Sequence, residues 1–549
     1  MPGGGELTLV AYGSQNKAIS GNPEMTFFYK VFKRHTHFSQ ESISISMDGP
    51  NEMMLDTPIR IRAKIPRSAD LLTDLTFVFN IPDLYSLSSP SRVPAARWIH
   101  MLGPLIIGNV GIYVGGSKIQ EFTGEWIALR AQMDLPVDQY LKWRNMVGDV
   151  PELHSPEWGI YGKAPNYPFA AGSYPHVYTN ATVTPAPSIP ATEIRVPLPF
   201  WFSEAIGKAL PLVALQLHEV EVQITLKTLR EVYKVMDNAS NGIVQKEPMR
   251  YGRNLVIDPA YPTSTTHPVS ATPTYFDNLA LQNNYTYSQP NSTDPLNTFY
   301  SPTTPVSQEG FIMNAHLEGN YVYLTEKEQL MFAERELNTL VHQVQMFNLP
   351  GVTTKTKLDM DVHGLIHRMV FFGRRSDAID IRNDYLNLSN WKNMAQAPYW
   401  PMPAPNIGYA TGGSSGALLP AGYANRDIIQ SARLICAGNE LFEEKPAKFF
   451  EVQVPYATTT GSGVSGLHPG IKPDDVFGPV YQIPFALHGS DHEQPSGTLN
   501  SSRLREFQLE VTPWPLAADA PYTFDFTVYV ESVNMVRFTN GMAGLAYAV

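Results

Sequence analysis

The feature that most constrains the fold is an internal repeat in the 549-residue chain. A Pro-Phe pair that ends a predicted strand and precedes a small-residue stretch occurs at Pro199 and again at Pro484. An alternating strand closes each unit, HEVEVQIT from His218 and REFQLEVT from Arg505. Alternation with period two predicts strands that bury one face. The spacing between the copies favours two tandem β-rich domains over a short solenoid repeat.

Two further patterns recur in the same order. Residues 111–121 (GIYVGGSKIQE) and 432–443 (ARLICAGNELFE) each combine a short apolar strand, a Gly-containing turn and a second strand, which predicts a hairpin. Residues 315–325 (AHLEGNYVYLT) and 528–539 (VYVESVNMVRFT) are alternating strands that end each half. Four patterns in one order make duplication the better interpretation.

Composition agrees with an all-β fold. The 46 Pro, 39 Gly, 27 Tyr and 26 Phe residues favour many short strands joined by turns. Only residues 125–132 and 325–340 have helical patterns. The second stretch opens with Thr325 and has Glu328 three residues later, which predicts a capped helix that links the halves.

The predicted organisation is an N-terminal arm (1–25), a first domain (26–325) and a second domain (326–549) that starts with the linker helix. Two segments, about 149–190 and 237–307, are rich in Pro, Thr, Ser, Asn and Tyr with little apolar alternation. Loops of this length are usually exposed or functional. We therefore expect the first domain to carry the larger protrusion.

Net charge and cysteine content constrain the class of protein. The net charge of −11 argues against a surface that coats nucleic acid, since phosphate binding needs a concentrated positive field. The one basic cluster (Lys30, Lys33, Arg34 and His35) suits a solvated strand edge or an anionic partner. Cys436 is the only cysteine, so no internal disulfide can form, which fits a reducing compartment.

The N-terminus, MPGGGELTL, lacks the basic start and apolar run of a secretory signal. An uncharged, largely apolar stretch between Arg97 and Lys118 contains Pro104 and five glycines, and it is interpreted as two buried strands instead of a membrane span.

Motifs for catalysis, cofactors or metals are nearly absent. The sequence has no GxxxxGK[ST], HExxH or CxxC pattern, no GxGxxG after a strand and no GxSxG nucleophile elbow. His363 and His367 have metal-ligand spacing, but VHGLIHRMVFF predicts a strand that places both on one face, where a structural pair is the commoner case. We predict no enzyme activity, no catalytic residue, no cofactor and no metal.

One catalytic alternative is a glycosidase, which needs two converging carboxyl groups. The candidate acids are Glu440, Glu443, Glu444, Asp491 and Glu493. Turn acids that face solvent are the simpler interpretation of these residues.

Glycosylation is a secondary hypothesis. Sequons fall in or beside the two long loops, at Asn180, Asn238, Asn284 and Asn291. The motif is common in Asn- and Thr-rich sequence, and the missing signal does not support exposure to the modifying machinery.

A family resemblance is spread along the chain. GNPxxTFF and RHTxF elements contribute Gly21, Asn22, Pro23, Phe27, Phe28, Arg34 and His35. The hairpin, PFWF and HEV elements contribute Gly115, Gly116, Trp126, Pro199, Phe200, Trp201, Phe202, His218 and Glu219. QPSGTxNxSR contributes Gln494, Pro495, Ser496, Gly497 and Arg503, and NGMAGLAY ends the chain at 540–547. In this order the elements resemble the major capsid proteins of nucleocytoplasmic large DNA viruses.

The resemblance implies a double jelly roll, with two tandem eight-stranded antiparallel sandwiches. It implies a homotrimer with a pseudo-hexagonal outline that tiles an icosahedral virion shell, assembled in the infected host cell, with the cytoplasm as the expected site. Neighbouring capsomers, minor capsid and penton proteins, and an internal membrane near the capsomer base are the implied partners, without direct nucleic-acid contact. The glycine hairpin and the PFWF strand are expected to set the core and the roll geometry, and Lys30, Lys33 and Arg34 are expected near the base.

Two other classes stay open at this stage. A minor capsid or penton protein shares the sandwich fold, although a penton needs only one roll. A carbohydrate-binding lectin would also be a Tyr-rich β-sandwich. Fold analogy does not decide among these functions, so assembly behaviour must.

Overall fold

The computed structural model describes most of the chain in two separate units, residues 1–39 and 40–549. The described residues are 4–24, 26, 28–29, 32, 34–54, 57–84, 92–154, 156, 188–239, 310–380, 383–388, 390, 427–459, 479–504, 506–516 and 522–547. All structural statements below concern these residues.

The N-terminal unit contains two short helices, α1 (Gly4–Val10) and α2 (Ser14–Ser20), which the sequence patterns did not predict. Every side chain described in this unit is exposed. Exposure of all of them agrees with an arm that has no core of its own.

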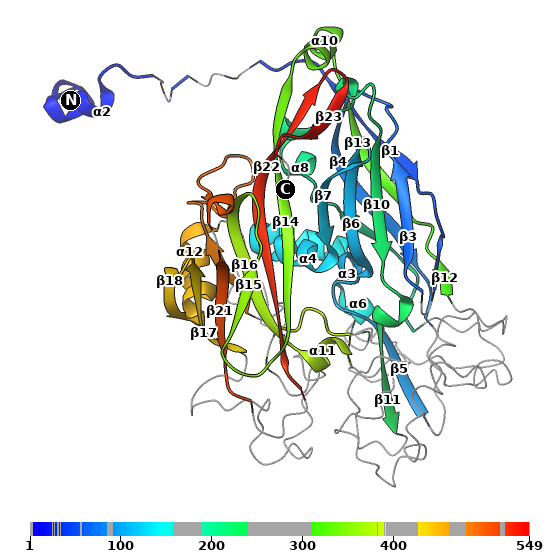
Figure 1. The fold of residues 1–549 in the computed structure, drawn as a ribbon. Helices are drawn as coiled ribbons and strands as arrows, with labels where there is room; N and C mark the ends of the chain where they lie inside the picture. The colour runs from blue at the N-terminus through cyan, green and yellow to red at the C-terminus, as the bar shows by residue number, and fades with distance from the viewer. Residues whose placement is uncertain are drawn as a thin grey trace. The chain divides into compact units, whose positions relative to one another are not determined.

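The first jelly roll consists of two facing sheets, each built on four main strands (Figure 1). One sheet has the order β1-β13-β4-β8 and the other the order β3-β10-β6-β7. Their bounds are β1 (Ser39–Ser46), β3 (Ile59–Lys64), β4 (Leu71–Ile81), β6 (Ile107–Val114), β7 (Ser117–Thr123), β8 (Thr192–Pro197), β10 (Val220–Leu226) and β13 (His316–Tyr323). The stretch between Arg97 and Lys118 supplies one buried strand, β6, as predicted, but the one-turn helix α3 (Leu102–Ile106) stands where a second strand was expected.

The second jelly roll repeats this topology. Its sheets have the orders β14-β22-β16-β19 and β15-β21-β17-β18. The bounds are β14 (Leu337–Val352), β15 (Thr356–Met360), β16 (Leu365–Arg375), β17 (Ile429–Cys436), β18 (Asn439–Pro446), β19 (Tyr481–Pro484), β21 (Phe507–Pro513) and β22 (Phe524–Thr539). Each predicted repeat occupies equivalent strands: β6–β7 matches β17–β18, β10 matches β21, and β13 matches β22. The tandem duplication is confirmed.

Smaller strands extend the two rolls. They are β2 (Glu52–Met54) with β12 (Gly310–Ile312), β5 (Arg92–Trp98) with β11 (Tyr233–Ala239), and β9 (Leu210–Pro211), β20 (Leu499–Asn500) and β23 (Met542–Leu545) at sheet margins. The β5–β11 ribbon points away from the first roll in Figure 1. Most of the two predicted long loops lies outside the described residues.

Helices connect and flank the sheets. The longer ones are α4 (Gly124–Asp134), α5 (Val137–Met146) and α10 (Glu326–Glu334), and the shorter ones are α6 (Pro151–His154), α8 (Trp201–Glu204), α11 (Ser376–Asp380) and α12 (Val454–Thr458). Single turns complete the set: η2 (Ile206–Lys208), η3 (Leu212–Ala214), η4 (Leu229–Glu231), η9 (Phe449–Gln453) and η11 (Ser501–Arg503).

The linker helix is present but shorter than predicted. α10 ends at Glu334, and β14 begins at Leu337, so the end of the predicted helix is strand. Residues 337–340 pair with β22, and this sheet pairing overrides a helical pattern. Thr325 occupies the N-cap position, but its side chain makes no capping hydrogen bond. α5 was not predicted, and α6 forms within the predicted 149–190 loop.

The two rolls do not have independent cores. One buried cluster fills the first roll and continues into the second through residues such as Val341, Val370 and Tyr529. A second cluster fills the interior of the second roll alone. The β16 and β22 strands are therefore buried on both faces along most of their length.

Candidate functional site: the seam between the two rolls

Helix α4 lies between the first roll and the β14–β22–β16 sheet of the second (Figure 1). Thr123 caps this helix by accepting a hydrogen bond from the Trp126 N–H at 3.2 Å. The Thr123 hydroxyl also lies 2.9 Å from the Tyr529 hydroxyl, across the roll boundary. The Trp126 and Tyr529 rings pack with centroids 5.0 Å apart. The apolar part of the contact therefore joins the two rolls through buried aromatic side chains.

Beside these rings lies a buried polar cluster, which we call the seam network. Its members are Arg130 and Asp134 of α4, Glu204 and Lys208 of the α8–η2 segment, and His342, His367, Arg368, His492 and Glu531 of the second roll. The first four residues come from one roll and the last five from the other. The cluster is thus shared between the rolls.

Arg368 is the central cation of the seam network. Its Nη1 and Nη2 each donate to an Asp134 carboxylate oxygen at 2.7 Å, and its Nε donates to Glu531 Oε2 at 2.6 Å. The Arg368 side chain is 1% exposed. A bidentate guanidinium–carboxylate pair fixes geometry as well as charge. Arg368 therefore holds α4 of the first roll against β22 of the second.

Glu204 is the central anion on the first-roll side. It accepts a hydrogen bond from Arg130 Nη2 at 2.7 Å and from Lys208 Nζ at 2.9 Å. Lys208 Nζ also donates to the backbone oxygen of His492 in the second roll. The one-turn helices α8 and η2 thus bring two charges to the seam, and Lys208 reaches across it.

The permanent charges of the seam network balance. Asp134, Glu204 and Glu531 supply three negative charges, and Arg130, Lys208 and Arg368 supply three positive charges. Burial alone would raise the pKa of Glu204 and Glu531, but nearby Arg130 and Arg368 outweigh it and hold both pKa values below their usual range. Each carboxylate remains ionised and paired.

Three histidine rings fill the space beside these charges. Ring centroids lie 5.5 Å apart for His342 and His367, 4.7 Å for His342 and His492, and 6.2 Å for His367 and His492. His492 Nε2 lies 3.0 Å from Glu531 Oε1. Within the described part of the chain, His367 has no hydrogen-bond partner at either ring nitrogen.

The predicted pairing of His363 with His367 is wrong. His363 precedes β16, lies 3.6 Å from Asp361 and is about half exposed, whereas His367 is completely buried in the strand. Gly364 separates them with φ +97°, which turns the chain before the strand begins. The histidine that matters for the seam was therefore noted in the sequence, but with the wrong neighbour.

Most seam residues were missed by sequence reasoning. The available signal was a charge inside an otherwise apolar strand, such as Arg368 in HRMVFF and Glu531 in YVESV. Buried charges are rare unless they are paired. Their partners could not be named from the sequence, because Arg368 and Asp134 are 234 positions apart.

The glycine hairpin motif meets the C-terminal motif at a second contact between the rolls. Gly115 (φ +57°) and Gly116 (φ +83°) form the β6–β7 turn, and a Cβ on Gly115 would lie 2.6 Å from the His218 ring. His218 Nδ1 accepts a hydrogen bond from the Ala543 N–H at 3.2 Å. Glu219 contacts Lys64 at the surface instead, with 2.9 Å between Oε2 and Nζ.

The PFWF motif supports α4 from the first-roll side. It is not a strand as predicted, because Trp201 begins the one-turn helix α8. Phe200, Trp201 and Phe202 are all buried. The backbone N–H of Trp201 donates to Gln120 Oε1 at 3.1 Å. The Pro199 carbonyl accepts from Arg130 Nη1 at 3.0 Å. The motif thereby orients a seam residue.

Of the remaining motif residues, those of the QPSG element lie in the loop that also carries His492 of the seam network. The QPSG element forms a turn in which the Ser496 hydroxyl accepts from the His488 N–H at 3.0 Å and Gln494 N–H donates to Asp491. Pro495 lies within this turn, Gly497 has φ +149°, and Arg503 is exposed at the end of η11.

The described residues of the N-terminal motif contribute no buried side chain. Gly21, Asn22, Pro23, Phe28, Arg34 and His35 are exposed, whereas Phe27, Lys30 and Lys33 lie outside the described residues. Arg34 and His35 precede β1 and are not part of a strand edge. Of the sequons, Asn180, Asn284 and Asn291 also lie outside the described residues, and Asn238 is placed only by its backbone, in β11.

The acids considered for a glycosidase have structural partners. Glu440 pairs with Arg433 at 2.6 Å, Glu443 with Lys445, and Glu444 with Lys355 at 3.2 Å. Hydrogen bonding from Lys445 lowers the pKa of Glu443, and hydrogen bonding from Ser431 lowers that of Glu444. A catalytic acid needs the opposite shift.

Asp491 and Glu493 lie in the QPSG turn. Asp491 Oδ1 accepts the Glu493 N–H at 2.9 Å. Although burial opposes the shift, backbone hydrogen bonds from Gln494 and Glu493 lower the pKa of Asp491. Both acids serve the turn, as the simpler interpretation predicted.

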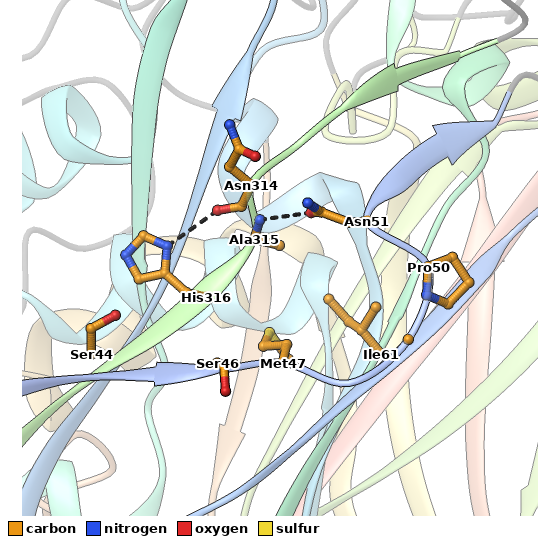
Figure 2. A pocket seen from close by; sticks show the side chains of 10 residues that line it. Ser44, Ser46, Met47, Pro50, Asn51, Ile61, Asn314, Ala315 and His316 are labelled. Carbon is orange, nitrogen blue, oxygen red and sulfur yellow. Dashed lines mark hydrogen bonds between the residues drawn. The ribbon is translucent and has the colours of Figure 1, made fainter.

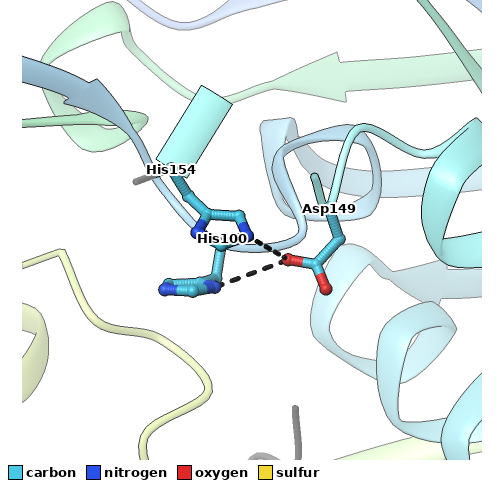
Figure 3. A group of neighbouring side chains, drawn as sticks. All are labelled: His100, Asp149 and His154. Atoms are coloured by element: carbon cyan, nitrogen blue, oxygen red, sulfur yellow. Dashed lines mark ion pairs between the residues drawn. The ribbon is translucent and has the colours of Figure 1, made fainter. Parts of the chain in front are cut away.

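A second histidine cluster lies at the end of α6 (Figure 3). His100 Nδ1 and His154 Nε2 lie 3.4 and 3.7 Å from Asp149 Oδ1, and the two rings are stacked with centroids 3.9 Å apart. Arg144 Nη2 lies 2.6 Å from Asp149 Oδ2, and the Met101 N–H donates to Oδ1 at 3.2 Å. Since the Arg144 charge already neutralises the single carboxylate, we interpret this cluster as a tie that holds α6 in place.

A surface hollow of about 460 Å³ lies beside β1, β3 and β13 (Figure 2). Its lining residues are Ser44, Ser46, Met47, Gly49, Pro50, Asn51, Ile61, Asn314, Ala315 and His316. Asn51 Oδ1 accepts the Ala315 N–H at 3.0 Å, so part of the polar lining is used internally. None of the lining residues is a Phe, Tyr or Trp, which does not favour a stacked sugar.

Across the described ranges, the helices are all too short or too polar to cross a lipid bilayer.

Family models match both rolls. Residues 26–276 match the model described as major capsid protein N-terminus, and residues 328–544 match the large eukaryotic DNA virus major capsid protein model. The major capsid protein of Phaeocystis pouchetii virus is 27% identical over 99% of each chain. That of Chrysochromulina ericina virus is 24% identical over 100% of each chain.

Solved structures share the fold. A quasi-atomic model of the PBCV-1 virus capsid aligns with a TM-score of 0.56 and 19% identity, over 95% of this chain and 100% of that one. The Faustovirus major capsid protein aligns with a TM-score of 0.56 and 11% identity, over 94% and 93% of the two chains.

Proposed function

Because the chain belongs to the major capsid proteins of large eukaryotic DNA viruses, we propose that three copies of it form a pseudo-hexagonal capsomer of the icosahedral shell. The observation that carries the proposal is the repeated strand order in two rolls that share a buried seam. Three chains with two similar rolls each supply six wedge-like units. The shared core keeps both units of a chain at one fixed angle, which a regular outline requires.

A three-fold trimer uses heterologous contacts, in which one face of a chain meets a different face of the next. The two rolls have the same topology but different outer residues. The β17–β18 hairpin, for example, presents Glu440, Glu443 and Glu444, whereas the β6–β7 hairpin presents Lys118. Diverged surfaces on similar frames allow such a directional contact.

The native mass of the purified chain tests the trimer. We expect a species near 3 × 61.1 = 183.3 kDa with a hexagonal outline in negative stain. A stable monomer under the same conditions, unchanged by addition of infected-cell extract, would contradict the capsomer. Sugar binding by that monomer would support the lectin class instead.

The N-terminal arm and its basic cluster are proposed to contact partners at the capsomer base, such as minor capsid proteins, pentons or an internal membrane. Support comes from exposed apolar side chains on and after α1, including Leu7, Leu9, Val10 and Tyr12, which have no core in their own unit. Assembly of the shell in the host cytoplasm is proposed on the resemblance alone.

Replacing Lys30, Lys33 and Arg34 with Ser tests the base contact. We expect lower particle yield with unchanged trimer mass and melting temperature, since the arm is outside the folded unit of 40–549. Particle yield equal to that of the unmodified chain would count against this role.

A further inference from the structure

We propose that the seam is an acid-sensitive joint, in which protonation of His342 and His367 loosens the contact between the two rolls. This inference goes beyond the capsomer function. It rests on the geometry and charge of the seam network and holds whether or not the chain forms a trimer.

The first argument is the lack of room for added charge. The three rings lie within 6.2 Å of one another, and His342 and His492 side chains are only 4% and 6% exposed. Protonation of two of them would place like charges together away from water. Such charges are costly unless they gain partners.

The second argument is that the nearby acids are already paired. Glu204 is bound by Arg130 and Lys208, and Asp134 is bound by Arg368. Glu531 is bound by Arg368 and lies beside His492.

The His342 Nδ1 atom lies 3.6 Å from Glu204 Oε2, which is too long for a hydrogen bond. Arg374 and Glu125, at the other end of α4, form a separate balanced pair. Protonated histidines would therefore give the seam a net positive charge.

The third argument is the pH window. Burial lowers the pKa of His342, and it lowers the pKa of His367 to about 4. Because the folded state binds fewer protons than the unfolded state, seam stability is lost as the pH falls from about 6.5 toward about 4. The seam acids, whose pKa values are depressed, lose their contribution only below about 4.5. Between pH 7 and 5 the loss of seam stability is therefore caused by the histidines and not by the carboxylates.

Hydrogen exchange on the full native oligomer at pH 7.5 and 5.5 tests the joint. After correction for intrinsic rates, we expect exchange in β14, β16 and β22 to accelerate about tenfold for each titrating histidine. The outer strands β17 and β21 should keep their protection. Equal protection at both pH values, or equal loss in inner and outer strands, would overturn the proposal.

Substitutions assign the effect to these residues. His367→Leu and His342→Leu should each reduce the acid response of the seam strands by about tenfold. His363→Leu is the matched control, because it removes an exposed histidine two residues before the same strand. His154, which is also buried, stays in all variants.

A full acid response in both seam variants would overturn the proposal. If His367→Leu does not fold at pH 7.5, hydrogen exchange of His342→Leu is compared with that of the unmodified chain, and this comparison decides the outcome.

Discussion

At the scale of single residues, Arg368 carries the strongest prediction. Arg368→Ala leaves Glu531 buried without a permanent cation and leaves Asp134 with only Arg130, whose Nε lies 3.6 Å away. Removing one partner of a buried ion pair costs about 3–5 kcal/mol, because the remaining charge stays desolvated. We expect a matching fall in the free energy of unfolding, measured by urea denaturation at pH 7.5.

Arg537→Ala is the matched control for Arg368. Arg537 is also on the central sheet of the second roll, but it pairs with Glu336 at the surface, with both side chains about half exposed. Exposed pairs contribute at most about 1 kcal/mol. Similar losses for both variants would mean that the seam network contributes no more than a surface pair.

At the same scale, the sequence predicted the structural roles of glycines and aromatic residues better than the roles of buried charged residues. Gly115 and Gly116 were assigned to a turn because local chemistry demands it, and the structure places both at positive φ. Phe200 and Trp201 were expected in a core because they are large and apolar. The seam network was not predicted, since each ion pair joins distant segments and no local pattern specifies its partner.

At the scale of secondary-structure elements, two helices begin with a threonine, but only one is capped by it. Thr123 accepts the Trp126 N–H at the start of α4 and also contacts the Tyr529 hydroxyl. Thr325 stands at the start of α10, whose residues are not buried, and makes no capping bond. A threonine at the N-cap position therefore makes a capping hydrogen bond in α4 but not in α10.

We expect Thr123→Val to lower the free energy of unfolding by about 1–2 kcal/mol, through the lost cap and the unpaired Tyr529 hydroxyl. Thr325→Val should change it by less than about 0.5 kcal/mol. Thermal melting of both variants measures the difference. A larger loss of stability for Thr325→Val than for Thr123→Val would contradict the role of α4 in joining the two rolls.

Strands were predictable as elements, but their depth of burial was not. Alternation identified β10 and β21, which bury one face. β16 and β22 are buried on both faces, because the second roll packs on the first through the outer face of their sheet. The predicted helix over 325–340 failed at its end for a related reason, because β14 gains a long pairing with β22.

At the scale of the whole molecule, the repeat in the sequence led to the correct architecture. Four local patterns were enough, because each lies on equivalent strands of the two rolls. The contact between the two rolls could not be predicted from these sequence patterns. This contact depends on α4, the charges around Arg368 and the continuous core, which come from many separate segments.

The continuous core predicts that the two rolls unfold together. Separating them would expose the outer face of the β14–β22–β16 sheet and remove Asp134 from Arg368, which would keep only Glu531 as a partner. We expect a single calorimetric transition for the full chain at pH 7.5, with the calorimetric enthalpy close to the van't Hoff value at fixed concentration.

Arg368→Ala weakens the seam without entering the interior of the second roll, so it should broaden this transition or split it into two. Arg537→Ala should leave its shape unchanged. Two resolved transitions in the unmodified chain would show that each roll is stable alone. The fixed angle required by a pseudo-hexagonal capsomer would then have to come from contacts between chains.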